Sequence, residues 1–187
     1  MPQPAWRREV RGWSLNGVLI RLGEHPLDTL VGMLLMDHPM GWVVGTPADP
    51  ADSDRLAGMI LNPQEGITDV MLEDIADHIA DAYFARPRWQ ARRLWEKAFG
   101  LWPELDGELY GNGVDILSAP ADRATNMVYR FLVHRMRHDK SASESFFEEM
   151  SRPPVGVAAR AAQRPKSKDA AAADWNATAA LVAQAQG

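Results

Sequence analysis

The acidic side chains in residues 69–81 have a spacing that could place metal ligands on one face of a helix. Glu73, Asp77 and Asp81 recur at every fourth residue, and His78 lies beside them. A carboxylate metal site in a helical bundle also needs inward-facing acids and a Glu-x-x-His pattern on a second helix, and the sequence has neither. We therefore expect a solvated acidic face. An enzyme or metal protein that uses Glu73, Asp77 and His78 is the least favoured functional interpretation of this sequence.

The other patterns with chemical potential are incomplete. His134 and His138 have a helical spacing that can bind metal, but no third ligand accompanies them, which favours a surface pair. No Gly-x-Ser-x-Gly is present, so the nucleophile turn of common hydrolases is missing. Gly111-Asn112-Gly113 lacks the Lys and the Ser or Thr that complete a phosphate-binding loop. The sequence therefore predicts a protein that is not an enzyme and has no catalytic residue, metal or cofactor.

The composition is that of one globular domain. The chain has 187 residues, of which 46% are hydrophobic and 24% charged. Its 20 Lys and Arg against 25 Asp and Glu give a net charge of −5, which disfavours binding to nucleic acid. Cysteine is absent, which excludes disulfides and thiol nucleophiles. The longest apolar stretch, residues 30–36, is far shorter than the ~20 residues of a membrane span, so we expect a cytoplasmic protein without a membrane partner.

Hydrophobic periodicity predicts a mainly α fold, a small helical bundle with a short N-terminal β-hairpin and a flexible C-terminal tail. The hairpin is expected at about residues 10–22, around an Asn16-Gly17 turn. Residues 41–45 are too short to assign. The expected helices cover approximately residues 27–37, 52–61, 68–85, 88–101, 104–111, 121–135 and 141–150.

Helix-capping signals accompany three of these helices. Thr68 is expected to cap the helix that follows it, Asp52 or Ser53 the helix at 52–61, and Ser118 the helix that follows Pro120. The helical domain is expected to cover residues 1–152. Residues 153–187 are rich in alanine and locally basic, with too few large apolar residues to form a core, and are expected to be the flexible tail.

Two consecutive helices have opposite charge. Residues 64–85 contain six acidic residues and no Lys or Arg, whereas residues 88–101 are rich in arginine. Such helices are suited to pack antiparallel with their charges meeting across the seam, although exposed pairs contribute only ~0.2–1 kcal/mol each. The stability of this pair is expected to come from burial of Leu72, Ile75, Leu94 and Phe99.

A tryptophan series accompanies the arginines of residues 86–102. Trp89, Trp95 and Trp102 could form a platform for stacking on single-stranded nucleic acid. Trp95 and Trp102 lie seven residues apart, which is two helical turns and favours packing in the core or at an interface instead.

The order of motifs in residues 67–156 resembles the tail assembly chaperones of long-tailed phages that infect actinobacteria. It runs from the acidic helix ITDVMLEDIADHIAD through Arg-Pro-x-Trp at residues 86–89 to WPELDGELYGNGVD, and then through PADR and NMVYRFLV to a Pro-Pro-x-Gly end. The residues that match the family pattern, and that we expect to have structural roles, are Asp106, Gly107, Glu108, Gly113, Asp115, Asp122, Arg123 and Tyr129. Gly107 and Gly113 are expected to be required by the backbone.

The resemblance implies a non-catalytic protein of the host cell cytoplasm that binds the tape measure protein, assists assembly of the tail tube around it and is absent from the mature virion. Its implied partners are the tape measure protein, the tail-tube protein and a longer form of itself made by ribosomal frameshifting. Self-association stays open. The alternative is a structural head-to-tail connector or another virion component. Client contacts are expected from Arg86, Trp89, Arg92, Arg93, Trp95, Trp102, Arg160, Arg164, Lys166 and Lys168.

Overall fold

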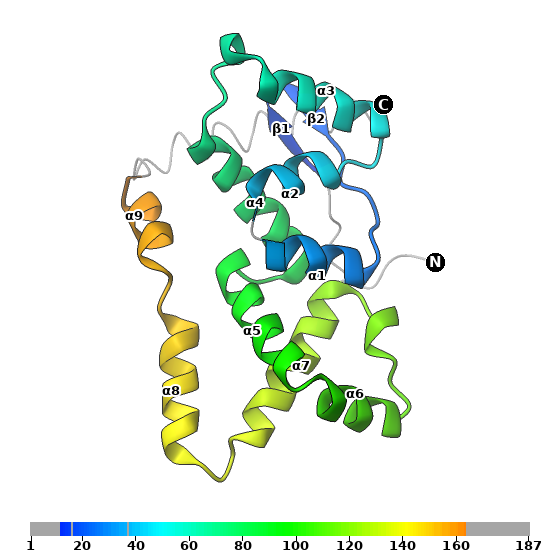
Figure 1. Cartoon of the computed structure of the whole chain (residues 1–187), viewed down its shortest axis with the longest axis vertical. Helices are drawn as coiled ribbons and strands as arrows, with labels where there is room; N and C mark the ends of the chain where they lie inside the picture. Colours follow the sequence, from blue (N-terminus) through cyan, green and yellow to red (C-terminus); the bar gives the residue numbers. More distant parts are fainter. Residues whose placement is uncertain (1–11, 16, 37, 164–187) are drawn as a thin grey trace, which may run out of the picture.

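The structure is a computed structural model that describes residues 12–15, 17–36 and 38–163. It confirms the mainly α-helical fold with an N-terminal two-stranded hairpin (Figure 1). In chain order the elements are β1 (Trp13–Leu15), β2 (Val18–Ile20), α1 (Leu27–Met36), α2 (Pro39–Gly45), α3 (Pro50–Leu61), the 3-10 turn η1 (Pro63–Glu65), α4 (Asp69–Phe84), α5 (Arg88–Gly100), α6 (Trp102–Gly111), the 3-10 turn η2 (Ile116–Ser118), α7 (Ala121–Arg135), α8 (Lys140–Ser151) and α9 (Val155–Gln163).

The hairpin pairs β1 and β2 antiparallel, with Trp13 opposite Ile20 and Leu15 opposite Val18. Gly17 in the turn has a φ of 79°, a left-handed conformation that glycine adopts without steric cost. Asn16, the other half of the expected turn, lies outside the described residues. Trp13, Leu15 and Ile20 are buried, so one face of the hairpin closes the core.

Among the N-terminal helices, one was left unassigned from the sequence and another has a different cap from the one predicted. Residues 41–45 belong to a helix, α2, which begins at Pro39 and packs on α4 with Trp42 and Val43 buried. Helix α3 begins at Pro50, and the side chain of Asp49 accepts a hydrogen bond from the Ala51 amide at 2.9 Å. The cap is therefore Asp49, because proline is favoured at the first helical position, and the prediction of Asp52 or Ser53 is wrong.

Helix α4 begins at a side-chain cap and ends at a residue in the left-handed backbone conformation. Thr68 caps it as predicted, since its hydroxyl accepts from the Met71 amide at 3.3 Å. Ala85, at the other end, has a left-handed φ of 53°. Within α4 the Tyr83 hydroxyl donates to the Gly23 carbonyl at 2.7 Å and ties the loop after the hairpin to the helix. Burial raises the pKa of Tyr83, so the hydroxyl keeps the proton that it donates.

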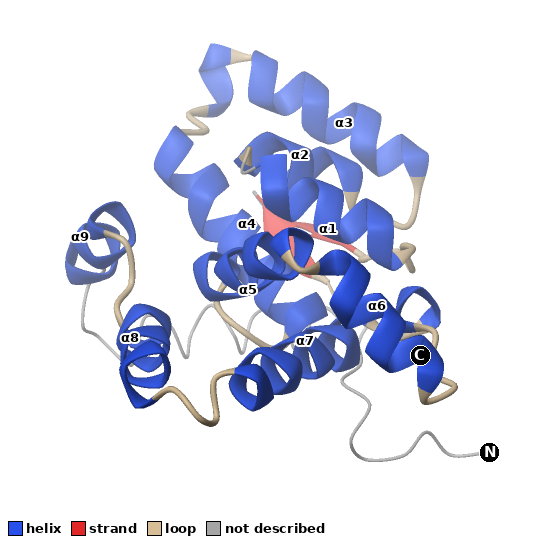
Figure 2. Ribbon diagram, turned by 60° about the horizontal axis from the view of Figure 1, so that its bottom comes forward, coloured by secondary structure: helices blue, strands red, loops and turns tan. Residues whose placement is uncertain are grey.

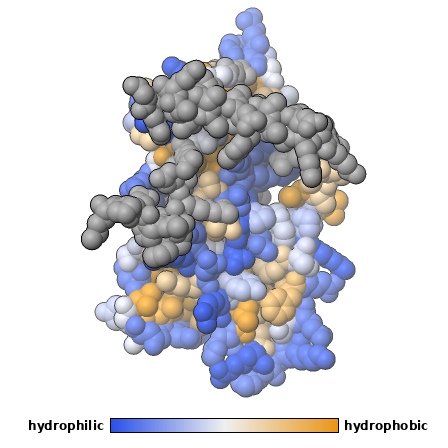
Figure 3. All heavy atoms as spheres, turned by 180° about the vertical axis from the view of Figure 1, so that it is seen from behind, coloured by the Kyte–Doolittle hydropathy of each residue, from blue (hydrophilic) through white to orange (hydrophobic). Residues whose placement is uncertain are grey.

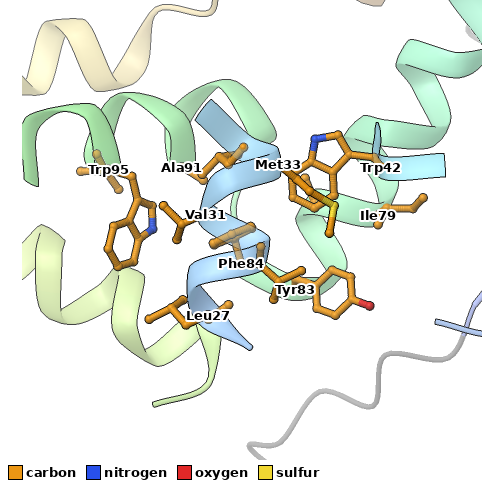
Figure 4. Close-up of a cluster of buried hydrophobic side chains, with 14 of the residues drawn as sticks. Leu27, Val31, Met33, Trp42, Ile79, Tyr83, Phe84, Ala91 and Trp95 are labelled. Carbon is orange, nitrogen blue, oxygen red and sulfur yellow. The ribbon is translucent and has the colours of Figure 1, made fainter. Parts of the chain in front are cut away.

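The core lies where α1 packs against α2, α4 and α5. Figure 4 shows Leu27 and Val31 of α1 facing Phe84 of α4 and Trp95 of α5. The Trp42 ring of α2 meets Phe84 edge-on, with centroids 6.2 Å apart and an interplanar angle of 79°. Aromatic rings favour this arrangement because the positive edge of one ring meets the negative face of the other. Large side chains from four helices therefore hold the first half of the chain to α5.

Helices α6 and α7 are joined by η2. Asp115 caps η2, because its side chain accepts a hydrogen bond from the Leu117 amide at 3.0 Å. The Ser118 hydroxyl donates to the Asp115 carbonyl at 2.9 Å, and α7 has no side-chain cap. The prediction of a Ser118 cap for α7 is therefore wrong. The apolar stripe of α7 is buried as its periodicity predicts, with Val128 fully buried.

The C-terminal arm, defined here as residues 140–163, consists of α8 and α9. Figures 1 and 2 both show it along one side of the molecule, beside α5 and α4. Helix α9 falls in the segment predicted as flexible tail, so the prediction of a flexible tail is wrong for residues 155–163. Residues 164–187 lie outside the described part of the chain.

Within the described residues, every helix is too short or too polar to cross a membrane.

Candidate functional site

Trp95 is a core residue and does not form part of an exposed platform. Its side chain is 1% exposed, and its indole Nε1 donates to the Thr125 hydroxyl of α7 at 2.9 Å. Thr125 in turn donates to the Ala121 carbonyl at 2.7 Å, so both buried polar groups are satisfied. The packing interpretation of Trp95 is confirmed, and the prediction that it contacts a client is wrong.

Arg86 joins two of the sequence motifs. Its Nη2 donates to the Asn126 side chain of α7 at 2.9 Å, and its guanidinium lies 4.7 Å from the centre of the Tyr129 ring. Its Nη1 also donates to Gln90 at 3.3 Å. A cation over an aromatic face is attracted by the ring quadrupole. Arg86 therefore has a structural role that sequence spacing could not show, since its partner Asn126 in α7 lies 40 residues away in the chain.

The basic side chains of α5 bind the C-terminal end of α8. Arg93 Nη1 donates to the carbonyls of Glu149 and of Arg152, the latter at 2.7 Å. Gln90 Nε2 donates to the Met150 carbonyl at 2.8 Å, and Lys97 Nζ lies 2.8 Å from the Glu149 carboxylate. The last carbonyls of a helix have no partner within the helix and carry its negative dipole end. Side chains of α5 therefore supply the partners that α8 lacks.

The predicted charge seam between α4 and α5 is confirmed in part, at Arg88. Arg93 and Lys97 contact α8, whereas Arg88 contacts α4. Arg92 pairs at 2.8 Å with Glu96 of its own helix. Arg93 also lies over the Trp89 ring, 4.9 Å from its centre, so Trp89 positions the guanidinium that binds α8.

A second polar cluster joins the arm to α4. Arg88, 5% exposed, bonds Glu73 through Nη2 and Asp77 through Nε, the latter at 2.9 Å. Arg160 of α9 places its Nη2 3.4 Å from each of the same two carboxylates. Two guanidinium groups thus neutralise two carboxylates. Glu73 and Asp77 are therefore ion-paired, and the prediction of a fully solvated face is wrong for them, while His78 and Asp81 are exposed.

Little apolar surface holds the arm. Of its described side chains, Phe146 and Met150 are the buried ones, and Phe146 lies 5.9 Å from the Tyr129 ring of α7. None of the described side chains in residues 155–162 is buried, and Val155 is 87% exposed. Full burial of one large apolar side chain contributes about 1.5–3 kcal/mol, so two such side chains give the arm a modest apolar anchor.

An aromatic pair lies on the surface where α5 meets α6. The Phe99 and Trp102 rings are stacked, with centroids 5.7 Å apart and an interplanar angle of 20°. Phe99 is 50% exposed, so the prediction that it belongs to the core is wrong. Figure 3, the reverse view, shows hydrophobic residues gathered in patches on the lower half of the molecule, among hydrophilic ones.

The motif residues of α6 and α7 have mixed roles. Gly113 has a φ of 75° and is required by the backbone as predicted, whereas Gly107 is helical with open space where a Cβ would lie, so that prediction is wrong. Tyr129 packs against Arg86 and Phe146. Asp115 caps η2. The remaining motif residues lie at or near the surface of α6 and α7: Asp106, Glu108, Asp122 and Arg123.

The two histidines predicted as a surface pair, His134 and His138, lie close to Arg137. Arg137 donates through Nε to His138 Nε2 at 2.7 Å and lies 2.9 Å from His134 Nε2. His138 lies beyond the end of α7, so the two histidines do not share one helix. The described residues contain no group of three or more His, Asp or Glu that could hold a metal ion. Arg164, Lys166 and Lys168 lie outside the described residues.

Comparison with known proteins yields no relative. No family model, curated protein or solved structure matches this chain. The site is therefore defined by its geometry. It is the surface of α4 and α5 on which Arg93, Gln90 and Lys97 hold one helix end while Glu73 and Asp77 hold an arginine of the next helix.

Proposed function

We propose that this protein is a phage tail assembly chaperone, which binds the tape measure protein and assists assembly of the tail tube without catalysing a reaction. The observation that carries the proposal is the succession of motifs in residues 67–156, from the acidic helix through Arg-Pro-x-Trp and Leu-Asp-Gly-Glu-Leu to the helix that contains Tyr129.

Contacts between these motifs support the proposal. Arg86 of the Arg-Pro-x-Trp motif bonds Asn126 and stacks on Tyr129, both in the helix after the PADR motif. Motifs that lie 40 residues apart in the chain therefore meet in one packed unit. A succession of motifs that also forms a packed unit is better evidence for a family pattern than the same succession scattered over unrelated surfaces.

The surface offers features suited to a helical client. Phe99 and Trp102 present a stacked aromatic pair, and Arg93 and Gln90 already bind a helix end. Long helical clients are recognised by surfaces that combine apolar anchors with charged groups at fixed positions. These features support a binding role for this protein.

The test is co-expression with the tape measure protein from the same genome. The expected result is a soluble tape measure protein that co-purifies with this chain. Replacing Phe99 by Ala tests the aromatic pair, and Tyr110→Ala is the matched control, because Tyr110 is 77% exposed at the other end of α6. Reduced co-purification with Phe99→Ala alone would support a client contact at the pair.

An insoluble tape measure protein that does not co-purify would contradict the chaperone proposal. Peptides of this chain in purified virions would then identify it as a structural component, with a head-to-tail connector as the leading candidate. The two outcomes are distinct because a chaperone leaves the assembled tail, whereas a connector stays in it.

A further inference from the structure

The surface beneath the C-terminal arm has the properties of a receptor for a helix. Three of its contacts go to main-chain carbonyls of residues 149–152, donated by Arg93 and Gln90. Main-chain carbonyls are present at the end of every helix, so these contacts select a helix end without requiring a particular side chain. Arg93 is held over the Trp89 ring, which fixes the donor before a helix arrives.

Side-chain contacts add the selectivity of this receptor. Phe146 and Met150, four residues apart on α8, are buried, and Glu149 between them pairs with Lys97. Beyond the helix end, Arg160 reaches Glu73 and Asp77. The ligand that fits is therefore a helix with two large apolar residues four positions apart, an acidic residue in its last turn, a helix stop, and a basic residue about two to three turns further on.

The arm occupies this receptor through contacts that are easy to exchange. Helices α8 and α9 lie at one edge of the molecule (Figure 2). Two buried apolar side chains, Phe146 and Met150, and ion pairs with Lys97, Glu73 and Asp77 hold them there. The turn at residues 136–138 joins it to α7. Segments with few buried apolar contacts open at a lower free energy than the core, so the arm is suited to move.

We propose that this receptor binds a helix of a client protein, and that the arm occupies it in cis until such a helix displaces the arm. The inference rests on the proposed chaperone function for the identity of the client, but the receptor itself is defined by the contacts above. Charge complementarity argues for an occupant of this kind, since the surface combines Arg93 and Lys97 for an acidic helix end with Glu73 and Asp77 for a basic residue beyond it.

The experiment uses the full chain with Phe146→Ala and Met150→Ala together, and a fluorescent peptide of residues 139–163 as the probe. In the wild-type protein the tethered arm competes at an effective concentration of about millimolar, so we expect the peptide to bind the double variant about tenfold more tightly by fluorescence anisotropy. The matched control is Phe147→Ala, which removes a neighbouring ring that is 45% exposed, and should bind the peptide as wild type does.

A third variant makes the result specific to the receptor. Arg93→Ala in the double-variant background removes the donor to two carbonyls and should weaken peptide binding by about tenfold. Arg55→Ala, on the exposed surface of α3, should not change it. Circular dichroism of each variant verifies that the body remains helical. No peptide binding to the folded double variant, or equal binding with Arg93 present and absent, would overturn the proposal.

Four further outcomes separate this inference from the proposed function. If the tape measure protein displaces the peptide and binds the double variant more tightly than wild type, both stand. If the peptide binds but the tape measure protein does not, the receptor stands and the client is another helical protein. If the tape measure protein binds all variants equally, the function stands and the receptor proposal fails. An arm-dependent dimer by light scattering would make a second copy the occupant and also overturn the proposal.

Discussion

The body of the molecule, which is the described part of residues 12–135, is stabilised in a different way from the C-terminal arm. The largest fully buried side chains, Trp42, Trp95 and Phe84 among them, all lie between Ile20 and Val128. The arm buries Phe146 and Met150 and otherwise relies on hydrogen bonds and ion pairs from α5 and α4. Burial of apolar area is non-directional and dominates folding, whereas a hydrogen bond exchanged with water contributes only about 0.5–1.5 kcal/mol.

This difference indicates that the two parts of the chain have different roles. The body supplies a rigid surface whose donors are fixed by packing, as Trp89 fixes Arg93. The arm supplies a ligand for that surface that can leave without disrupting the core. If the comparison is correct, substitutions in the body should unfold the molecule, and substitutions in the arm should release α8 and α9 alone.

The largest effect is expected for Trp42→Ala in the body. Trp42 is fully buried against Phe84, so its truncation leaves a large cavity and should lower the free energy of unfolding by about 3–5 kcal/mol. Urea denaturation measures this change. Tyr110→Ala, at a side chain 77% exposed, should change it by less than about 0.5 kcal/mol. A loss under 1 kcal/mol at Trp42 would remove the basis for placing the core there.

The next largest effect is expected for Arg88→Met, at the junction of the two regions. Arg88 is buried between Glu73 and Asp77, and its loss leaves partly buried carboxylates with less positive charge, which should cost about 3 kcal/mol in urea denaturation. Adding Asp77→Asn should restore part of that loss. The control is Arg55→Met, whose exposed pair with Asp52 spans 3.9 Å. Equal losses for the two arginines would contradict a special role for burial.

A smaller and more local effect is expected for Phe146→Ala in the arm. Truncation of a buried Phe costs about 3–5 kcal/mol where the whole structure depends on it, but here the loss cannot exceed the free energy that docks the arm, so we expect it to fall below that range. Hydrogen exchange should accelerate at amides of α8 and α9 and stay unchanged in α4 and α5. Phe147→Ala, at a ring 45% exposed, is the control. Faster exchange throughout the body would show that the two regions unfold together.

Much of the fold could be predicted from the sequence because apolar spacing determines which helix faces are buried. The helices of the acidic and basic segments and the Thr68 cap were predictable in this way. Helix α2 was not, since its seven residues contain two glycines and are held by burial of Trp42 and Val43 against α4. Helix α9 was also missed, because it lacks large buried residues and Arg160 provides its ion pairs with α4.

The sequence predicted which residue types line the site, but not the groups that they bind. The arginine-rich face of α5 was visible, but the groups it binds are main-chain carbonyls, which have no sequence signature. The sequence predicted that charges of α5 and α4 would meet, but it could not identify the partners of Arg88, which lie 11 and 15 residues away and beyond the reach of helical periodicity. The spacing of Trp95 was compatible with a nucleic-acid platform or with core packing. The hydrogen bond from its indole to the buried Thr125 hydroxyl favours core packing.

Two glycines test the backbone conformation of α6 and of the turn after it. Like the arm, α6 buries few apolar side chains. Gly113→Ala should cost about 1 kcal/mol, since its φ of 75° is unfavourable for a residue with a Cβ. Gly107→Ala should instead stabilise by about 0.5–1 kcal/mol, because Gly107 is helical and nothing lies within 4 Å of an added Cβ. Thermal unfolding of the two variants should give shifts of opposite sign, and shifts of the same sign would contradict the assigned conformations.

The smallest effect is expected for Arg160→Gln at the outer end of the arm. Its side chain is 24% exposed and lies 3.4 Å from each carboxylate, and such a pair contributes about 0.2–1 kcal/mol at low salt. Hydrogen exchange should accelerate in α9 but not in α8, because Phe146 and Met150 still anchor α8. The difference from wild type should shrink as salt is raised toward 1 M, where the screening length falls to about 3 Å. A loss that is independent of salt would mean that packing, not charge, holds α9 to the body.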